Sequence, residues 1–236
     1  MEDCIILKNV LKPEDIEYLK GIKELLKNDP ESHKSRATHG KRANNVYNIT
    51  EKTIYKNNLI FEWLDQYMPW DREVYEYWGV NFYDLQNPYA LHSDGNDTCK
   101  TFYQGIIPLS IEPSSKEAYT VIFDQTADTN VEWIAPIYGK PDDYTPFYNK
   151  GIRDPRYFGG WSDEYKISDE HGYKHWGSKW DTTFREAYKG FSIKYEYKWE
   201  VGDIFLFDSK FTHCATELLE KGIHQKTGLL FCLNRR

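Results

Sequence analysis

The sequence predicts a mainly β protein, a jelly-roll of antiparallel strands with helices confined to its N-terminal part. Runs rich in Val, Ile, Tyr, Phe and Trp follow one another from residue 73 onward, and clusters of Gly, Pro, Asn and Asp separate them. Clear helical spacing of apolar residues is confined to residues 1–70. The length agrees with one domain over residues 1–236, because β-sandwiches and barrels of this size are commonly single domains.

The first 70 residues are expected to form a helical lead-in that packs on the sheet. The apolar run at residues 4–7 predicts a short strand, and Pro13 is suited to the first turn of the helix that follows. This helix should end before Pro30, because a proline disfavours the helical conformation in the residue that precedes it.

The remainder of the lead-in predicts a loop and a second helix. Residues 31–48 are polar and lack periodicity, so we expect a loop there that borders the site. Apolar residues over residues 50–67 form one broad helical face, and Asn48 with Glu51 is the expected capping pair of this second helix.

The strands of the predicted jelly-roll alternate with turns. They are expected over residues 73–83, 101–109, 119–123, 191–199 and 203–208. The run at residues 191–199 is the cleanest, because Ile193, Tyr195, Tyr197 and Trp199 alternate with polar residues and predict one buried aromatic face.

A long aromatic-rich segment interrupts the strand pattern at residues 124–190. Tyr and Trp alternate there with Gly, Pro, Asp and Lys, and no helix or strand period persists. Disordered segments are depleted in aromatic residues, so an ordered insertion is expected. Long ordered insertions in compact domains are usually functional, and we predict that this one folds over the barrel mouth as a lid.

Composition restricts the class of protein. The net charge of −7 disfavours a broad nucleic-acid surface, and we interpret the basic cluster of Lys34, Arg36, Lys41 and Arg42 as a solvated loop. No apolar run reaches the length of a membrane span. The acidic N-terminus lacks the pattern of a signal peptide, and the cysteines lack paired metal-site spacing, so we expect a cytoplasmic protein with free thiols. The oligomeric state cannot be inferred from the sequence.

A metal site is predicted by residues far apart in the chain. His92 and Asp94 are two positions apart, so in an extended strand both side chains point to one face. His213 follows a strand-like run and supplies a third ligand. Two histidines and one carboxylate leave positions open on an octahedral ion, as in non-haem Fe(II) oxygenases. Lys226 opens a final apolar strand, where a lone cation needs an anionic partner.

This series resembles the Fe(II)/2-oxoglutarate-dependent dioxygenases, which share the order His-x-Asp, distal His, then Arg or Lys. The spacing Tyr83-x5-Tyr89-x2-His92-x-Asp94 is similar to the prolyl-hydroxylase-like branch, which also often uses a lysine. The resemblance implies a double-stranded β-helix, the jelly-roll of this family, and spans most of the chain.

Roles for several residues follow from the resemblance. It implies that His92, Asp94 and His213 hold the catalytic Fe(II) and that Lys226 anchors 2-oxoglutarate as co-substrate, with Tyr83 and Gln104 as further co-substrate contacts. With O2, such an enzyme hydroxylates a C–H bond of a small-molecule or peptidyl substrate, prolyl included, and releases succinate and CO2. Gly228 departs from the family, which often has a small polar residue two places after the anchor.

Alternatives remain open at this point. Cupin-type isomerases and hydrolases hold metals in the same fold and would not need Lys226, and a non-catalytic jelly-roll could bind a protein or glycan through the insertion. His171 and His175 have the i, i+4 spacing of metal ligands on a helix, but Gly172 between them and the lack of a clear acidic ligand favour surface or lid histidines.

Overall fold

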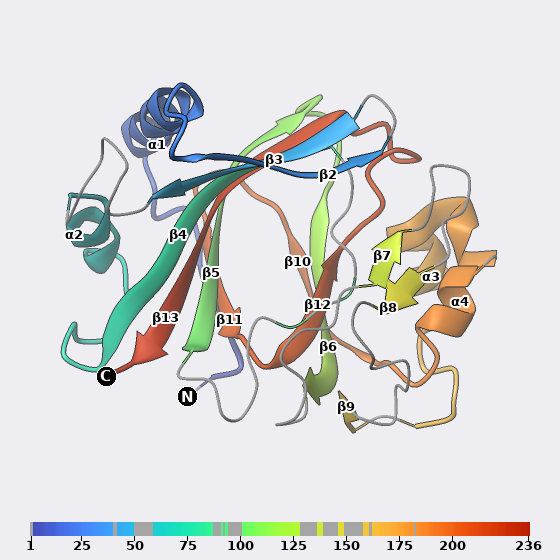
Figure 1. The fold of residues 1–236 in the computed structure, drawn as a ribbon. Coiled ribbons are helices and arrows are strands. Elements are labelled where there is room, and N and C mark those ends of the chain that lie inside the picture. Colours follow the sequence, from blue (N-terminus) through green and yellow to red (C-terminus); the bar gives the residue numbers. More distant parts are fainter. Residues whose placement is uncertain are drawn as a thin grey trace.

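We describe the fold from a computed structural model. It describes residues 2–39, 42–49, 59–86, 91, 93, 101–127, 136–138, 146–148, 158–160, 162–181 and 183–236. In this part of the chain, antiparallel strands form two facing sheets, the predicted jelly-roll, and helices cover the outer face of each sheet (Figure 1).

The larger sheet has seven strands within the described residues. In spatial order they are β1 (Cys4–Leu7), β11 (Ile204–Asp208), β5 (Thr101–Glu112), β13 (Gln225–Arg235), β4 (Tyr75–Leu85), β3 (Arg42–Ile49) and β2 (His33–His39). All registered neighbours are antiparallel, and β13 lies between β5 and β4. The last apolar run of the sequence therefore becomes an interior strand of this sheet, where its residues are mostly buried.

The smaller sheet is built from chain segments on either side of the insertion. Its described strands are β10 (Ile193–Lys198), β6 (Tyr119–Ala127) and β12 (Phe211–Ala215), and the short β9 (Phe158–Gly159) pairs with β6. A separate pair joins β7 (Pro136–Tyr138) to β8 (Pro146–Tyr148).

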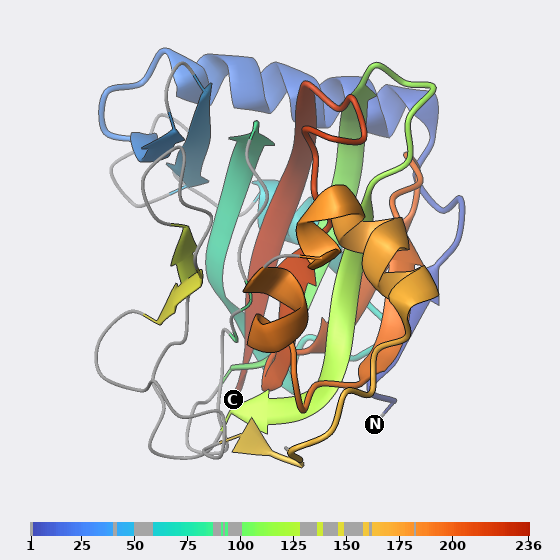
Figure 2. The ribbon, with the colours of Figure 1, turned by 90° about the vertical axis from the view of Figure 1, so that its right-hand side faces the viewer.

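Helices lie on the outside of both sheets. On the outer side of the larger sheet are α1 (Pro13–Lys27) and α2 (Leu59–Asp65), and α1 runs across the strands (Figures 1 and 2). On the far side, next to the smaller sheet, are α3 (Asp169–Trp176), a 3-10 turn (Gly177–Asp181) and α4 (Thr183–Ala187). None of the described helices is long and apolar enough to cross a membrane.

Successive side chains along each strand of the larger sheet point alternately into two cores, one under the helices and one between the two sheets. Leu229, Phe231 and Leu233 of β13 pack with α1 and α2 on the outer face of the larger sheet. Leu230 points the other way, into the core between the two sheets, as does Phe205 of β11. The inner core contains side chains of both sheets, so the space between the sheets is where a shared site is built.

Several predicted elements are confirmed and others are wrong. The first strand and first helix are confirmed, and the helix ends with Asn28 as its C-cap. The predicted loop at residues 31–48 is wrong, because β2 and β3 form an antiparallel hairpin that extends the larger sheet. Polar strands at a sheet margin lack the apolar alternation that sequence reasoning depends on.

The second helix is shorter in the structure than in the prediction. Within the described residues it covers Leu59–Asp65, and residues 50–58 lie outside them. Asn48 belongs to β3 and pairs with Asn81 of β4, so it does not cap this helix. Tertiary pairing of the β-strand takes precedence here over a local capping pattern.

The insertion carries more regular structure than its composition predicts. Its first residues continue β6 to Ala127, and helices form at 169–176 and 183–187, so the expectation of no regular period is wrong there. Trp176, Trp180 and Tyr188 pack on Phe123 and other residues of the outer face of the smaller sheet. The position of a lid stays a prediction, because residues 128–135, 139–145 and 149–157 lie outside the described part.

Candidate functional site

The candidate site lies in the core between the two sheets. Lys226 and Gly228 alternate with the outward-facing Leu229, so they belong to the inner face of β13. In the antiparallel register, Lys226 is opposite Leu85, and Gly228 is opposite Tyr83, both on the inner face of β4. Tyr83 and Lys226 were both predicted as site residues and are 143 positions apart in the chain. The structure places them on adjacent strands.

Lys226 is almost completely buried, with 2% of its surface exposed. Its Nζ lies 3.9 Å from the ring centroid of Trp199, the residue after β10. No described carboxylate forms an ion pair with Lys226. Burial lowers the pKa of the ammonium to about 7, against an opposing effect of Cys214. The site therefore contains a cation whose desolvation is offset mainly by an aromatic face.

Tyr83 occupies the space that a side chain at position 228 would need. A Cβ at Gly228 would lie 2.8 Å from the Tyr83 hydroxyl and 3.1 Å from the carbonyl oxygen of Ile107. The ring of Tyr83 meets Trp199 edge-on, with centroids 6.1 Å apart. The phenol of Tyr83 therefore lies against position 228, two residues after Lys226.

We expect Gly228→Ala to destabilise the protein by about 1–3 kcal/mol, since overpacking forces neighbouring atoms to move. Gly79→Ala is the matched control on β4, because a Cβ there meets nothing within 4 Å. Urea unfolding of both variants measures the difference. Equal stabilities would contradict the close approach of Tyr83 to Gly228, and Tyr83→Phe combined with Gly228→Ala should recover part of the loss.

His213 lies on β12 with 4% of its surface exposed. Its neighbour Cys214 belongs to the outer cluster, so the imidazole of His213 is on the inner face. Its ring packs on Phe207 with centroids 4.8 Å apart, and Nδ1 lies 3.1 Å from the carbonyl oxygen of Phe211. A proton on Nδ1 donates to that carbonyl and leaves Nε2 with the lone pair that a metal takes.

Gln104 is a buried amide on the same interior surface, 1% exposed. In the register of β5 it lies between Phe207 and Cys232, and Phe207 is the ring that contacts His213. Its Oε1 has no hydrogen-bond partner among the described residues. A buried unsatisfied amide oxygen needs an explanation, such as a ligand or an ordered water.

The predicted ligands His92 and Asp94 lie outside the described residues. Their neighbours Leu91 and Ser93 are described and buried, and Leu91 packs in the outer cluster of the smaller sheet. The prediction that His92 and Asp94 ligate the metal with His213 therefore stays a prediction, and Tyr89 lies outside the described part as well.

An ion pair is buried directly behind the candidate site. On the outer face of the larger sheet, Asp84 accepts hydrogen bonds from Lys23 Nζ at 2.9 Å, Thr227 Oγ1 at 2.6 Å and Tyr47 Oη at 3.4 Å. Asp84 and Thr227 are the residues next to Tyr83 and Lys226 on the same two strands. This network joins α1, β3, β4 and β13 where the candidate anchor is held.

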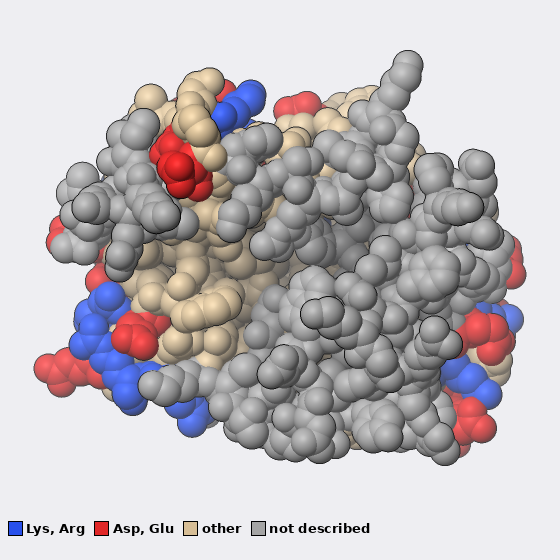
Figure 3. Space-filling view, in the orientation of Figure 1, with Lys and Arg blue, Asp and Glu red and all other residues tan. Residues whose placement is uncertain are grey.

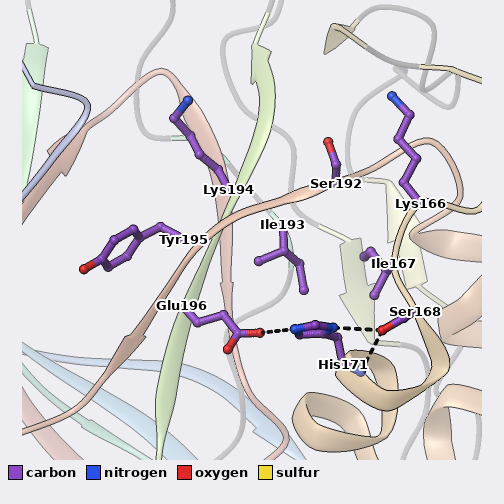
Figure 4. A pocket seen from close by; sticks show the side chains of 9 residues that line it. All are labelled: Lys166, Ile167, Ser168, His171, Ser192, Ile193, Lys194, Tyr195 and Glu196. Atoms are coloured by element: carbon purple, nitrogen blue, oxygen red, sulfur yellow. Dashed lines mark hydrogen bonds and ion pairs between the residues drawn. The ribbon is translucent and has the colours of Figure 1, made fainter.

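An open cavity of about 500 Å³ lies between α3 and β10, lined by residues other than those of the candidate site (Figure 4). His171 is bonded through Nδ1 to Ser168 Oγ at 2.8 Å, and its Nε2 lies 3.6 Å from Glu196 Oε1. The buried His175 lies 2.7 Å from the same oxygen, and burial lowers its pKa to about 4. Lys174 also pairs with Glu196.

These contacts show what the two histidines of α3 do. Both lie beside one carboxylate of β10, and a lysine shares it, so the cluster ties α3 to the smaller sheet. In the part of the chain that the structure describes, no group of three or more His, Cys, Asp or Glu side chains is placed to hold a metal. In the structure, the two histidines thus connect α3 to Glu196 of the smaller sheet.

Charges on the described surface are mixed. On the face in Figure 3, the described Lys and Arg side chains lie next to Asp and Glu side chains rather than in a continuous basic field. Lys8, Lys194 and Lys198 each form ion pairs with carboxylates. This surface offers mainly paired charges.

Two residues of the site were not predicted as such from the sequence. Trp199 was expected only as a buried strand residue, and its contact with Lys226 depends on how the two sheets face each other. Asp84 lies inside the motif segment, but nothing local predicts its pairing with Lys23, 61 positions away. The sequence offered one indication that Asp84 has a buried partner, namely that it is a charged residue within an apolar strand.

The fold is shared with several solved structures. No protein-family model matches the sequence, and no curated protein does. The fold is similar to that of the epimerase SnoN, solved with Fe3+, alpha ketoglutarate and nogalamycin RO, at a TM-score of 0.52 and 10% identity over 99% of this chain and 79% of that one.

Two further solved structures agree with it. A prolyl-4-hydroxylase of Pseudomonas putida matches with a TM-score of 0.50 and 12% identity, over 99% of this chain and 93% of that one. EctD of S. alaskensis, solved with 2-oxoglutarate and 5-hydroxyectoine, matches with a TM-score of 0.50 and 10% identity, over 99% and 72%. The chain therefore has the jelly-roll fold of the 2-oxoglutarate-dependent oxygenases, as the resemblance of its sequence implies.

Proposed function

We propose that the protein is a 2-oxoglutarate-dependent non-haem iron oxygenase, with His92, Asp94 and His213 as metal ligands and Lys226 as the co-substrate anchor. The observation that carries the proposal is the buried ammonium of Lys226, which has no carboxylate partner among the described residues. Buried charges are costly unless they are paired. The far carboxylate of 2-oxoglutarate is a partner of the right charge.

The one described ligand of the proposed set, His213, has the chemistry of a metal ligand. His213 is an inward-facing imidazole whose Nδ1 is occupied by a backbone carbonyl, which is the usual support of a metal-ligating histidine. Two histidines and a carboxylate are the ligands of non-haem Fe(II) oxygenases. Among the solved structures of similar fold, SnoN holds Fe3+ with alpha ketoglutarate, and EctD holds 2-oxoglutarate.

Each residue of the interior has a physical task in this proposal. Lys226 pairs with the far carboxylate, and the Tyr83 hydroxyl, held above Gly228, donates a hydrogen bond to it. The amide nitrogen of Gln104 donates a hydrogen bond to the co-substrate, and its unsatisfied amide oxygen accepts from an ordered water. Trp199 and Phe207 exclude water from these polar groups. When bound, iron and 2-oxoglutarate supply an oxidising centre that uses O2 and releases succinate and CO2.

For the reaction, we propose hydroxylation of a C–H bond in a small-molecule or peptidyl substrate, with prolyl groups among the candidates. The tyrosine spacing and the lysine anchor support this choice, as does the structural similarity to a prolyl-4-hydroxylase. The fold alone does not select hydroxylation, since SnoN is an epimerase and SnoK a carbocyclase. Mass analysis of products from candidate substrates decides between oxygen insertion and rearrangement.

The decisive experiment is anaerobic addition of Fe(II) and then 2-oxoglutarate to the purified protein. We expect a visible charge-transfer band of the metal chelate in the wild type, no band in His92→Ala, and a band that needs about 100-fold more 2-oxoglutarate in Lys226→Ala, since the latter loses a charged hydrogen bond.

His224→Ala is the matched control, because this histidine is exposed on the segment before β13, and it should keep the full band. A folded wild-type protein without any band would refute the oxygenase proposal and favour a cupin-type enzyme or a binding module. A band that survives unchanged in Lys226→Ala would assign the anchor to another residue.

A further inference from the structure

The contact between Lys226 and Trp199 is the starting point of a further inference. The ammonium lies 3.9 Å from the centroid of the indole ring, within the range of a strong cation–π interaction. The indole is fixed in place: its Nε1 donates to Thr120 Oγ1 at 2.9 Å, and its backbone N–H donates to the carbonyl oxygen of Ala118 at 2.9 Å. These two hydrogen bonds therefore fix the ring face that contacts the ammonium of Lys226.

No negative charge faces Lys226 from the described elements around it. On β4 the inner neighbours are Leu85 and the phenol of Tyr83, and on β5 the registered partner is Ile111. On β12 the titratable group of the inner face is the buried imidazole of His213. Its neighbour Cys214 lies on the outer face, and burial raises the pKa of this thiol to about 12, so it is neutral at physiological pH. An ammonium in such surroundings loses its proton more easily than one in water.

We propose that Trp199 is a positioning residue that holds the side chain of Lys226 in the free protein, and that binding of a dicarboxylate is coupled to the uptake of one proton by Lys226. This inference rests on the proposed function, because it takes 2-oxoglutarate as the ligand. The ring face stabilises a cation but is far weaker than an anion in the same place. Arrival of a carboxylate therefore favours the protonated lysine.

The consequence for affinity follows from the fraction of protein that carries the ammonium. Burial lowers the pKa of Lys226 to about 7, so this fraction falls about tenfold for each pH unit above that value. The apparent dissociation constant is the intrinsic one divided by this fraction. We expect 2-oxoglutarate to bind roughly 25-fold more weakly at pH 8.5 than at pH 6.5.

The test is anaerobic calorimetry of 2-oxoglutarate binding to Mn(II)-loaded protein at pH 6.5, 7.5 and 8.5, in HEPES and in Tris. Because the two buffers differ in ionisation enthalpy, the difference in heat counts the protons taken up. From a pKa of about 7, we expect uptake close to one proton at pH 8.5 and roughly a quarter of a proton at pH 6.5. Lys226→Arg should show neither uptake nor this loss of affinity, since a guanidinium stays protonated.

Variants of the ring test the part played by Trp199. Trp199→Leu removes the cation–π interaction, so the loss of affinity should begin about one pH unit lower, while Trp199→Phe keeps a ring face and most of the wild-type profile. Trp63→Leu on α2 is the control, because this indole packs on α1, and its profile should match the wild type.

The outcomes separate this inference from the proposed function. If the wild type binds 2-oxoglutarate with equal affinity at pH 6.5 and 8.5, proton coupling is refuted and the oxygenase proposal stands. Failure of the wild type to bind 2-oxoglutarate overturns both. If Lys226→Arg does not bind, near-UV circular dichroism of the free protein still decides: a transition near pH 7 that Lys226→Met lacks supports the inference, and its absence in the wild type overturns it.

Discussion

Lys226→Met is expected to make the protein more stable, because it removes a buried charge that has no described carboxylate partner. The same variant is expected to weaken 2-oxoglutarate binding by at least about 100-fold, because it removes a charged hydrogen bond to the ligand. Lys226 is fully buried without a described carboxylate partner. Methionine fills nearly the same volume without a charge. We expect the free energy of unfolding to rise by on the order of 2 kcal/mol at pH 6.

The sign of the pH dependence follows from the lowered pKa. In the folded protein the pKa of Lys226 is about 7, below its ordinary value in the unfolded chain. Below pH 7 both states carry the proton and the folded state bears the full cost of burial. As the pH rises from 7 toward the unfolded value, this cost disappears.

Urea unfolding at pH 6 and pH 9 measures the effect, and the advantage of the methionine variant should shrink at pH 9. Lys210→Met is the control, because the side chain of this lysine is 38% exposed and its replacement should change neither property appreciably. Retention of wild-type 2-oxoglutarate affinity by Lys226→Met would show that Lys226 is not the anchor.

Asp84→Asn is expected to destabilise the protein by about 2–4 kcal/mol, because removal of one member of a buried ion pair leaves the other charge without compensation. Lys23 and Asp84 have side-chain exposures of 10% and 8%, and their atoms are 2.9 Å apart. Glu24 lies 3.7 Å from Lys23 and offsets part of the loss. The double variant Asp84→Asn with Lys23→Met should recover much of the stability.

Chemical unfolding provides the measurement, and Glu17→Gln provides the matched control. Glu17 pairs with Lys20 on the same helix at the same 2.9 Å, but the two side chains are 73% and 39% exposed, so we expect a change below about 0.5 kcal/mol. A similar small change in Asp84→Asn would contradict the burial of the Lys23–Asp84 pair.

The sequence was most informative where local chemistry and burial agree. The strand at residues 4–7, the helix from Pro13 and the strands around β5, β6, β11 and β13 were predicted because apolar spacing, proline and turn residues indicate the same elements. The β2–β3 hairpin was missed because its strands are polar, and the interior of the insertion was missed because its helices are short and rich in aromatic residues. In both places tertiary contacts stabilise what local propensity leaves undetermined.

A bulge shows the same limit on a strand that was predicted well. Alternation in residues 191–199 predicts one buried face, and Tyr197 and Trp199 do lie in the inner core. For Tyr195 the prediction is wrong, because this side chain is exposed. Ile193 packs instead against the outer cluster, because the register with β6 shifts between Ile193 and Tyr195. A single extra residue moves a side chain to the opposite face, and the alternation of residue types does not reveal it.

By itself the sequence determined the jelly-roll class, the candidate ligands His92, Asp94 and His213, and the lysine on the last strand, since strand periodicity and ligand chemistry are local properties. The tertiary structure alone decided what surrounds that lysine: the indole face of Trp199, the phenol of Tyr83 above Gly228, and the Asp84 network behind the sheet. These contacts join segments far apart in the chain. Their geometry depends on the register of neighbouring strands and on the distance between the two sheets, and local sequence determines neither of them.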